Sequence, residues 1–173
     1  MIWVWSILGS LVGLVAIMVL VGYALPVGHR ASRKIRLPMS AAEVWEILVD
    51  FASHPTWRRS LKEIEQIPDP EGKEVWKEKT SDGDLTLEIT EAIPPYRLVR
   101  RIVNKDLPFG GEWVFELIEL NGECVLTITE NGEVYNPLFR FLSRFAFGHT
   151  GSINDFLTSL AAKCGTSNVP EDV

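Results

Sequence analysis

The sequence predicts an α+β fold, in which an antiparallel sheet of consecutive strands packs on a long C-terminal helix and follows a membrane-crossing helix. Three observations lead to this class. Residues 1–28 contain no Asp, Glu, Lys or Arg. Between residues 61 and 133, apolar and polar residues alternate with a period of two, which is typical of half-buried strands. From residue 138 to residue 164, apolar residues recur at spacings of three and four, which indicates one face of a helix.

The uncharged N-terminal run is long enough to span a bilayer. About 20 apolar residues at a rise of ~1.5 Å cross a hydrocarbon core of ~30 Å, and a helix satisfies its own backbone polar groups there. Trp3, Trp5 and Tyr23 lie at the two ends of the run, where interfacial aromatic residues belong. The competing interpretations are a cleaved signal peptide, which needs a basic segment before a shorter apolar core, and a buried core helix. We favour a retained membrane anchor over residues 1–28.

A basic juxtamembrane linker over residues 29–36 connects this anchor to the first strand. Its cations are Arg30, Arg33, Lys34 and Arg36. Cytoplasmic flanks of membrane helices carry the excess of Lys and Arg, so the sequence predicts a single-pass protein whose N-terminus lies outside and whose domain lies in the cytoplasm. The same cations suit contact with lipid headgroups. The alternative is an ordinary solvated linker.

The rest of the chain is acidic. The protein has 17 Lys and Arg against 23 Asp and Glu, and four of the basic residues lie in the linker. An acidic domain is a poor general binder of nucleic acid, so no nucleic-acid partner is expected. Cys124 and Cys164 stand far apart without a partner motif, which suits a reducing compartment. A disulfide between these two cysteines is the alternative.

The first elements of the domain are a short strand and two short helices. The strand is expected over residues 33–37. Ser40 then stands three residues before Glu43, which is the spacing of a capping box, and an apolar stripe continues to about Phe51. Pro55 disfavours helix at the residue before it and can begin a new turn. The sequence therefore predicts one helix that ends before Pro55 and a second that begins there.

Six further strands follow in an antiparallel meander, because short turns join them. Ser81-Asp82-Gly83 and Asn121-Gly122 are hairpin signals, and Pro94-Pro95 breaks the pattern. The strands are expected at residues 61–67, 73–80, 85–90, 96–104, 112–120 and 123–133.

The long C-terminal helix is expected over residues 138–164. Gly148 and Gly151 weaken its middle by about 1 kcal/mol each relative to alanine, so a kink or a short break is predicted there. The domain as a whole is assigned to residues 33–165. The polar tail over residues 166–173 is predicted to be disordered.

Four stretches of this chain resemble the START-like superfamily, also called SRPBCC, which includes birch pollen allergen relatives, polyketide cyclases and lipid-transfer START domains. They are AAEVWEILVDFASHPTW, GKEVWKEKTSDGDLTLEITEAIPPYRLVRR, GGEWVFELIELNGECVLTITENGEV and LFRFLSRFAFGHTGSINDFLTSL. The resemblance implies the helix-grip fold, in which a curved sheet of seven antiparallel strands wraps the C-terminal helix. Two short helices follow the first strand, and a cavity lies between sheet and helix.

The cavity implied by the resemblance is the candidate ligand site. Alternation places Arg100 and Glu130 on strand faces that would point inward near the rim, where they pair or hold the polar end of a ligand; the alternative is that either is solvated. Trp57 faces the cavity or the core, and His149 is a catalytic base or a satisfied interior residue. The candidate lining is Trp45, Trp57, Leu87, Leu98, Arg100, Trp113, Phe115, Leu126, Glu130, Phe145, His149 and Phe156.

No motif indicates a metal or a cofactor. His29, His54 and His149 are scattered, and the sequence has no metal-ligand spacing, phosphate-binding loop or nucleophile elbow. The first hypothesis is a membrane-anchored protein, not an enzyme, that binds a lipid or isoprenoid-like molecule. The second is a cyclase or dehydratase with His149, Arg100 and Glu130 as acid-base groups. The third is an interaction module with a filled core.

Overall fold

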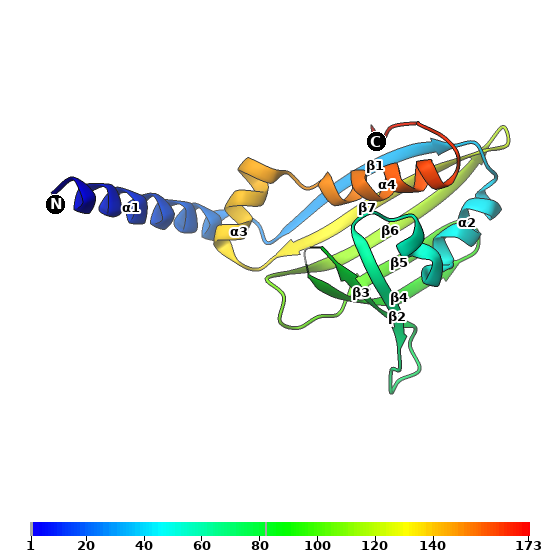
Figure 1. Ribbon diagram of the computed structural model, residues 1–173, viewed down its shortest axis with the longest axis horizontal. Helices are drawn as coiled ribbons and strands as arrows, with labels where there is room; N and C mark the ends of the chain where they lie inside the picture. The colour runs from blue at the N-terminus through cyan, green and yellow to red at the C-terminus, as the bar shows by residue number, and fades with distance from the viewer. Residues whose placement is uncertain (1, 82) are drawn as a thin grey trace.

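The computed structural model describes residues 2–81 and 83–173. Helix α1 (Ile2–Ala24) extends from the domain as a separate rod (Figure 1). Among the described residues, it supplies the one helix that is long and apolar enough to cross a membrane, over Trp3–Ala24, and nearly all of this segment is exposed. Its 23 residues correspond to a length of about 35 Å. The predicted apolar helix is therefore confirmed.

An antiparallel sheet forms the body of the domain, with the strand order β2-β3-β4-β5-β6-β7-β1-β8. Strands β2 to β7 form the predicted meander, and β1 pairs with β7 along its whole length. The strands are β1 (Gly28–Leu37), β2 (Leu61–Ile67), β3 (Val75–Thr80), β4 (Asp84–Ile93), β5 (Arg97–Ile102), β6 (Phe109–Leu120), β7 (Glu123–Val134) and β8 (Glu171–Asp172).

The sheet differs from the prediction at one edge, which β1 and β8 form. β1 begins at Gly28, so the basic segment is strand and not linker, and β8 lies in the tail that was expected to be disordered. β8 pairs with β1 and places Asp172 against Arg33. Arg36 forms an ion pair with Glu123. The sheet thus has eight strands instead of seven. The predicted turn between β3 and β4 includes Asp82, which lies outside the described residues.

The two short helices after β1 are α2 (Ala41–Val49) and η1 (Phe51–Thr56), as predicted. The capping box is present: the Glu43 backbone N–H donates to Ser40 Oγ at 3.3 Å, and the Ser40 backbone N–H donates to the Glu43 carboxylate at 2.8 Å. The break between the helices falls at Asp50, earlier than expected, and Pro55 lies inside η1.

The C-terminal helix is broken near Gly148, as predicted, but the part before the break does not lie on the sheet. The segments are α3 (Pro137–Leu142), the π-helical turn η2 (Ser143–Phe147) and α4 (Gly151–Lys163). The break falls at Gly148, whose φ of 73° favours glycine. Only α4 lies across the sheet, and its buried side chains include Ile153, Phe156 and Leu160 (Figure 1). Phe145 is 62% exposed, so it does not line the interior.

Helix α3 packs instead on the C-terminal end of α1. The Arg140 guanidinium donates to the carbonyl oxygens of Gly22 and Leu25, each at 3.0 Å, and to those of Val134 and Tyr135, each at 2.9 Å. A side chain at Gly22 would collide with the backbone of Pro137. These contacts fix the end of α1 against the domain.

Candidate functional site

Aromatic side chains fill the space between α4 and the sheet. The Phe156 ring lies 5.5 Å from Trp57, 5.9 Å from Trp113 and 5.5 Å from Phe115, measured between ring centroids. Phe115 is 1% exposed. Four other predicted lining residues are also buried: Trp45, Leu87, Leu98 and Leu126. Where the sequence predicted a cavity, these residues therefore form a packed core, and their contact with a ligand stays a prediction.

Arg100 and Glu130 do not pair with each other. Arg100 is 4% exposed and forms an ion pair with Glu78, which is 1% exposed and also accepts a hydrogen bond of 2.8 Å from Arg58. Arg100 thus lies in the interior and not at a rim. A buried charge needs a partner, and the carboxylate of Glu78 supplies one to both guanidinium groups.

The buried cluster of Arg58, Glu78 and Arg100 shifts the pKa values of Glu78 and His54. Burial alone would raise the pKa of Glu78, but the charges and hydrogen bonds of Arg100 and Arg58 lower it to about 2. His54 is buried beside the cluster, and its Nε2 lies 3.1 Å from the Leu48 carbonyl oxygen. Burial, followed by the charges of Arg100 and Arg58, lowers the pKa of His54 to about 3. His54 is therefore neutral at physiological pH and is a structural residue.

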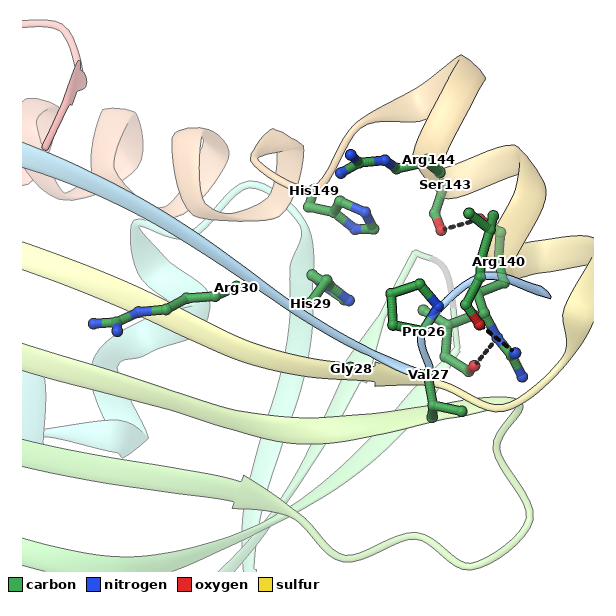
Figure 2. Close-up of a pocket in the computed structure, with 11 residues that line it drawn as sticks. Pro26, Val27, Gly28, His29, Arg30, Arg140, Ser143, Arg144 and His149 are labelled. Carbon is green, nitrogen blue, oxygen red and sulfur yellow. Dashed lines mark hydrogen bonds between the residues drawn. The ribbon is translucent and has the colours of Figure 1, made fainter. Parts of the chain in front are cut away.

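A pocket of about 220 Å³ lies at the end of the domain nearest α1 (Figure 2). Ligand pockets for drug-sized molecules usually measure ~300–1,000 Å³, so this volume suits one end of a ligand rather than a whole one. Apolar residues from the α1–β1 connection meet polar residues from α3, η2 and the loop before α4. The lining is Leu25, Pro26, Val27, Gly28, His29, Arg30, Val134, Arg140, Ser143, Arg144 and His149.

His29 lines this pocket, and Glu130 is the hydrogen-bond partner of its ring. His29 Nε2 lies 2.9 Å from Glu130 Oε1, and Trp113 Nε1–H donates to Glu130 Oε2 at 2.8 Å. The β1–β7 register places His29 opposite Gly132, and a side chain at Gly132 would collide with the His29 ring. The glycine therefore makes room for the imidazole beside the carboxylate.

His149 covers His29 from the other side. The two imidazole rings stack with centroids 3.7 Å apart and an interplanar angle of 22° (Figure 2). Burial and the charge of His29 lower the pKa of His149, and Glu130 partly offsets this effect. Arg144 also lowers it, and its side chain lies near His149 in Figure 2, whereas Arg30 points away along β1.

The two ring nitrogens of His29 have different surroundings. An ionised carboxylate only accepts hydrogen bonds, so His29 donates from Nε2–H to Glu130 Oε1. Among the described residues, His29 Nδ1 is buried and has no hydrogen-bond partner. Residues 2–81 and 83–173 hold no group of three His, Cys, Asp or Glu side chains suited to a metal ion. Cys124 and Cys164 are free thiols.

The structure brings together two histidines that looked scattered in the sequence. Of the predicted site residues, His149 lines this pocket, and Glu130 and Trp113 are linked to it through hydrogen bonds that end at His29. His29 and Arg144, which also line the pocket, were missed. The sequence carried no clear signal for His29, because polar and apolar residues alternate strictly only over residues 34–37 and not around His29.

The chain belongs to the family described as "Polyketide cyclase / dehydrase and lipid transport", whose pattern matches residues 28–165. The observed helix-grip fold agrees with this assignment. No curated protein matches the chain significantly.

Several solved structures share the fold. A START superfamily protein from Mycobacterium smegmatis is 15% identical, with a TM-score of 0.63, and the match covers 79% of this chain and 97% of that one. A conserved protein from Geobacillus kaustophilus is 22% identical, with a TM-score of 0.65 and coverage of 83% and 99%. The Zhui aromatase/cyclase from a Streptomyces species is 12% identical, with a TM-score of 0.59 and coverage of 80% and 94%. At these identities the likeness shows the fold alone.

Proposed function

We propose that this protein is a membrane-anchored START-like domain that binds one end of a lipid or isoprenoid-like molecule in the pocket lined by His29 and His149. The observation that carries the proposal is the place of the pocket, directly after the helix that is suited to cross a membrane. His29 is the fifth residue after the end of α1, so it lies within about 18 Å of that end. An apolar ligand could keep its tail in the bilayer while its head enters the pocket.

The polar groups of the pocket favour a ligand with a negatively charged or hydrogen-bonding head. Arg144 is exposed and cationic, and the stacked imidazoles of His29 and His149 line the same space. Apolar contacts with Leu25, Pro26 and Val27 would supply the remaining affinity at ~25 cal/mol per Å² buried. The basic residues that follow α1 support a cytoplasmic domain and an external N-terminus.

Mass spectrometry of molecules that co-purify with the full chain in mild detergent tests this function. We expect an amphipathic molecule to accompany the wild-type protein and to be lost from Ser143→Trp, whose indole would occupy the pocket. Leu120→Trp is the matched control, because Leu120 is 48% exposed at the far end of β6 and should change nothing. Equal retention by both variants, or no bound molecule in the wild-type protein, would refute the proposal.

A second function, acid-base catalysis of the cyclase or dehydratase type, is favoured by the His29–Glu130 pair. His29 Nδ1 is buried beside the stacked His149 ring, so it would remove a proton from a bound substrate only after that ring moves aside, and Glu130 would then stabilise the imidazolium that forms. Arg100 no longer qualifies for this role, because Glu78 holds it in the interior. Incubation of the extracted ligand with wild-type protein and with Glu130→Gln decides the point: conversion to a product by the wild type alone supports an enzyme, and no conversion by either supports a carrier.

A further inference from the structure

We infer that residues 137–147, which form α3 and η2, lie in the membrane interface beside α1 and contact an anionic lipid surface. This aromatic segment is a second membrane contact, separate from the ligand pocket. The inference rests on the proposed anchoring by α1, but it does not depend on which ligand the pocket takes.

The aromatic segment exposes large apolar side chains. Phe139, Phe145 and Phe147 are 51%, 62% and 74% exposed. Contiguous exposed apolar patches mark contact sites on proteins, and a helix that combines phenylalanines with arginines is typical of segments that lie in the bilayer interface. Water is therefore a poor environment for this surface.

The charge of the aromatic segment fits anionic headgroups. The chain has no Asp or Glu between Glu133 and Asp155, although it carries 23 acidic residues in total. Arg140 and Arg144 lie in this acid-free stretch. Because Arg140 is occupied by four backbone carbonyl oxygens, Arg144 is the cation left to meet a lipid phosphate.

The position of α3 relative to α1 places the aromatic segment at the depth of the membrane interface. Trp5 and Tyr23 are separated by about 27 Å along the helix at ~1.5 Å per residue, close to the ~30 Å hydrocarbon core. Tyr23 therefore marks one interface. The neighbouring Gly22 packs against Pro137, the first residue of α3. Helix α3 thus begins where α1 leaves the hydrocarbon.

The direction of α3 completes the argument. In Figure 1, α3 runs across the axis of α1 and not along it. When α1 crosses the bilayer, α3 therefore runs along the membrane plane, as interfacial helices do. A bilayer is a better partner than a second protein for two reasons. The segment continues the surface of α1, and the hydrogen bonds from Arg140 to the Gly22 and Leu25 carbonyl oxygens hold it beside the end of α1.

Spin labels on the full chain test this inference. Single cysteines are introduced as Phe145→Cys and Phe147→Cys in a Cys164→Ser background; Cys124 stays, because it is fully buried and burial raises the pKa of its thiol to about 11. Leu14→Cys in α1 and Ile118→Cys on β6 are the reference sites, 49% and 58% exposed. The proteins are reconstituted in vesicles of phosphatidylcholine and phosphatidylglycerol, and collisions of each label with oxygen and with a water-soluble nickel chelate are measured.

We expect the labels at residues 145 and 147 to prefer oxygen over the nickel chelate several-fold more than the label at residue 118 does. A membrane-buried label at residue 14 combined with water-exposed labels at 145 and 147 would overturn the inference while leaving the anchor intact. Dipolar broadening between labels at 147, with shielding from both reagents, would overturn it in favour of a second copy of the chain. Ligand retention is a separate measurement, so its failure would not be mistaken for failure of this inference.

Discussion

Replacement of Glu78 by Gln is expected to destabilise the domain by about 3 kcal/mol at neutral pH. The fall of the Glu78 pKa from 4.5 to about 2, at about 1.4 kcal/mol per pH unit, corresponds to this free energy. Loss of one partner from a buried ion pair typically costs ~3–5 kcal/mol, because the remaining charge is left without compensation. In Glu78→Gln, both Arg58 and Arg100 would lose the carboxylate.

The effect of Glu78→Gln also depends on pH. Because the native pKa is below the unfolded value, the stabilisation from Glu78 is fully present above pH 4.5 and is lost as the pH falls toward 2. Thermal unfolding of the full chain in mild detergent, followed by near-UV circular dichroism, measures it. Glu63→Gln is the control, since its partner Lys79 is 40% exposed and such surface pairs contribute about 0–1 kcal/mol. Equal stability of the two variants at pH 7 would refute the reasoning.

Three further predictions concern His54, Gly132 and Gly22. Wild-type stability should fall by about 2–3 kcal/mol between pH 7 and pH 4.5, because unfolded His54 gains a proton near pH 6.5 whereas native His54 has a pKa of about 3. His54→Gln should flatten this dependence of stability on pH, as measured by unfolding at several pH values. Gly132→Ala should push the His29 ring away from its carboxylate partner and change the imidazole NMR shifts. Gly22→Leu should separate α1 from Pro137 and speed hydrogen exchange across residues 137–147 several-fold.

The two glycine predictions have matched controls in the same elements. Gly28→Ala in β1 meets its nearest atom, the Gly132 carbonyl oxygen, at 3.9 Å and should leave the His29 signals unchanged. Gly13→Leu in α1 meets nothing within 4 Å and should leave the exchange of residues 137–147 unchanged. If either control behaved like its partner variant, the change would reflect loss of glycine and not the collision. An unflattened pH slope in His54→Gln would show that another group controls acid stability.

Local sequence signals were enough to predict most of the fold. The capping box at Ser40 and Glu43, the period-two strands and the Asn121-Gly122 turn each depend on residues close together in the chain, and the structure contains all three. The prediction that the whole C-terminal helix packs on the sheet was wrong for a physical reason. Apolar spacing of three and four shows that a segment buries or presents one face, but not what that face meets. Residues 137–147 kept the spacing while turning toward α1 instead of the sheet.

The candidate site was harder to predict because its parts come from distant strands. His29 and Glu130 are 101 residues apart and meet only through the antiparallel register of β1 and β7. That register could not be assigned while residues 29–36 were read as a linker. The buried cluster of Arg58, Glu78 and Arg100 was missed for the same reason, since it joins the end of η1 to β3 and β5. Charged residues in a strand look solvated until their cross-strand partners are known.

The connection between α1 and β1 holds the pocket closer to α1 than a flexible tether would. Only three residues, 25–27, separate the end of α1 from the start of β1. Arg140 holds the carbonyl oxygens of Gly22 and Leu25, so these residues cannot swing freely. A Gly/Ser linker of 20 residues would let a domain move by about 25 Å, whereas here His29 lies within about 18 Å of the end of α1. If α1 crosses a bilayer as proposed, this short connection favours exchange of a ligand with that bilayer over capture of a ligand from water.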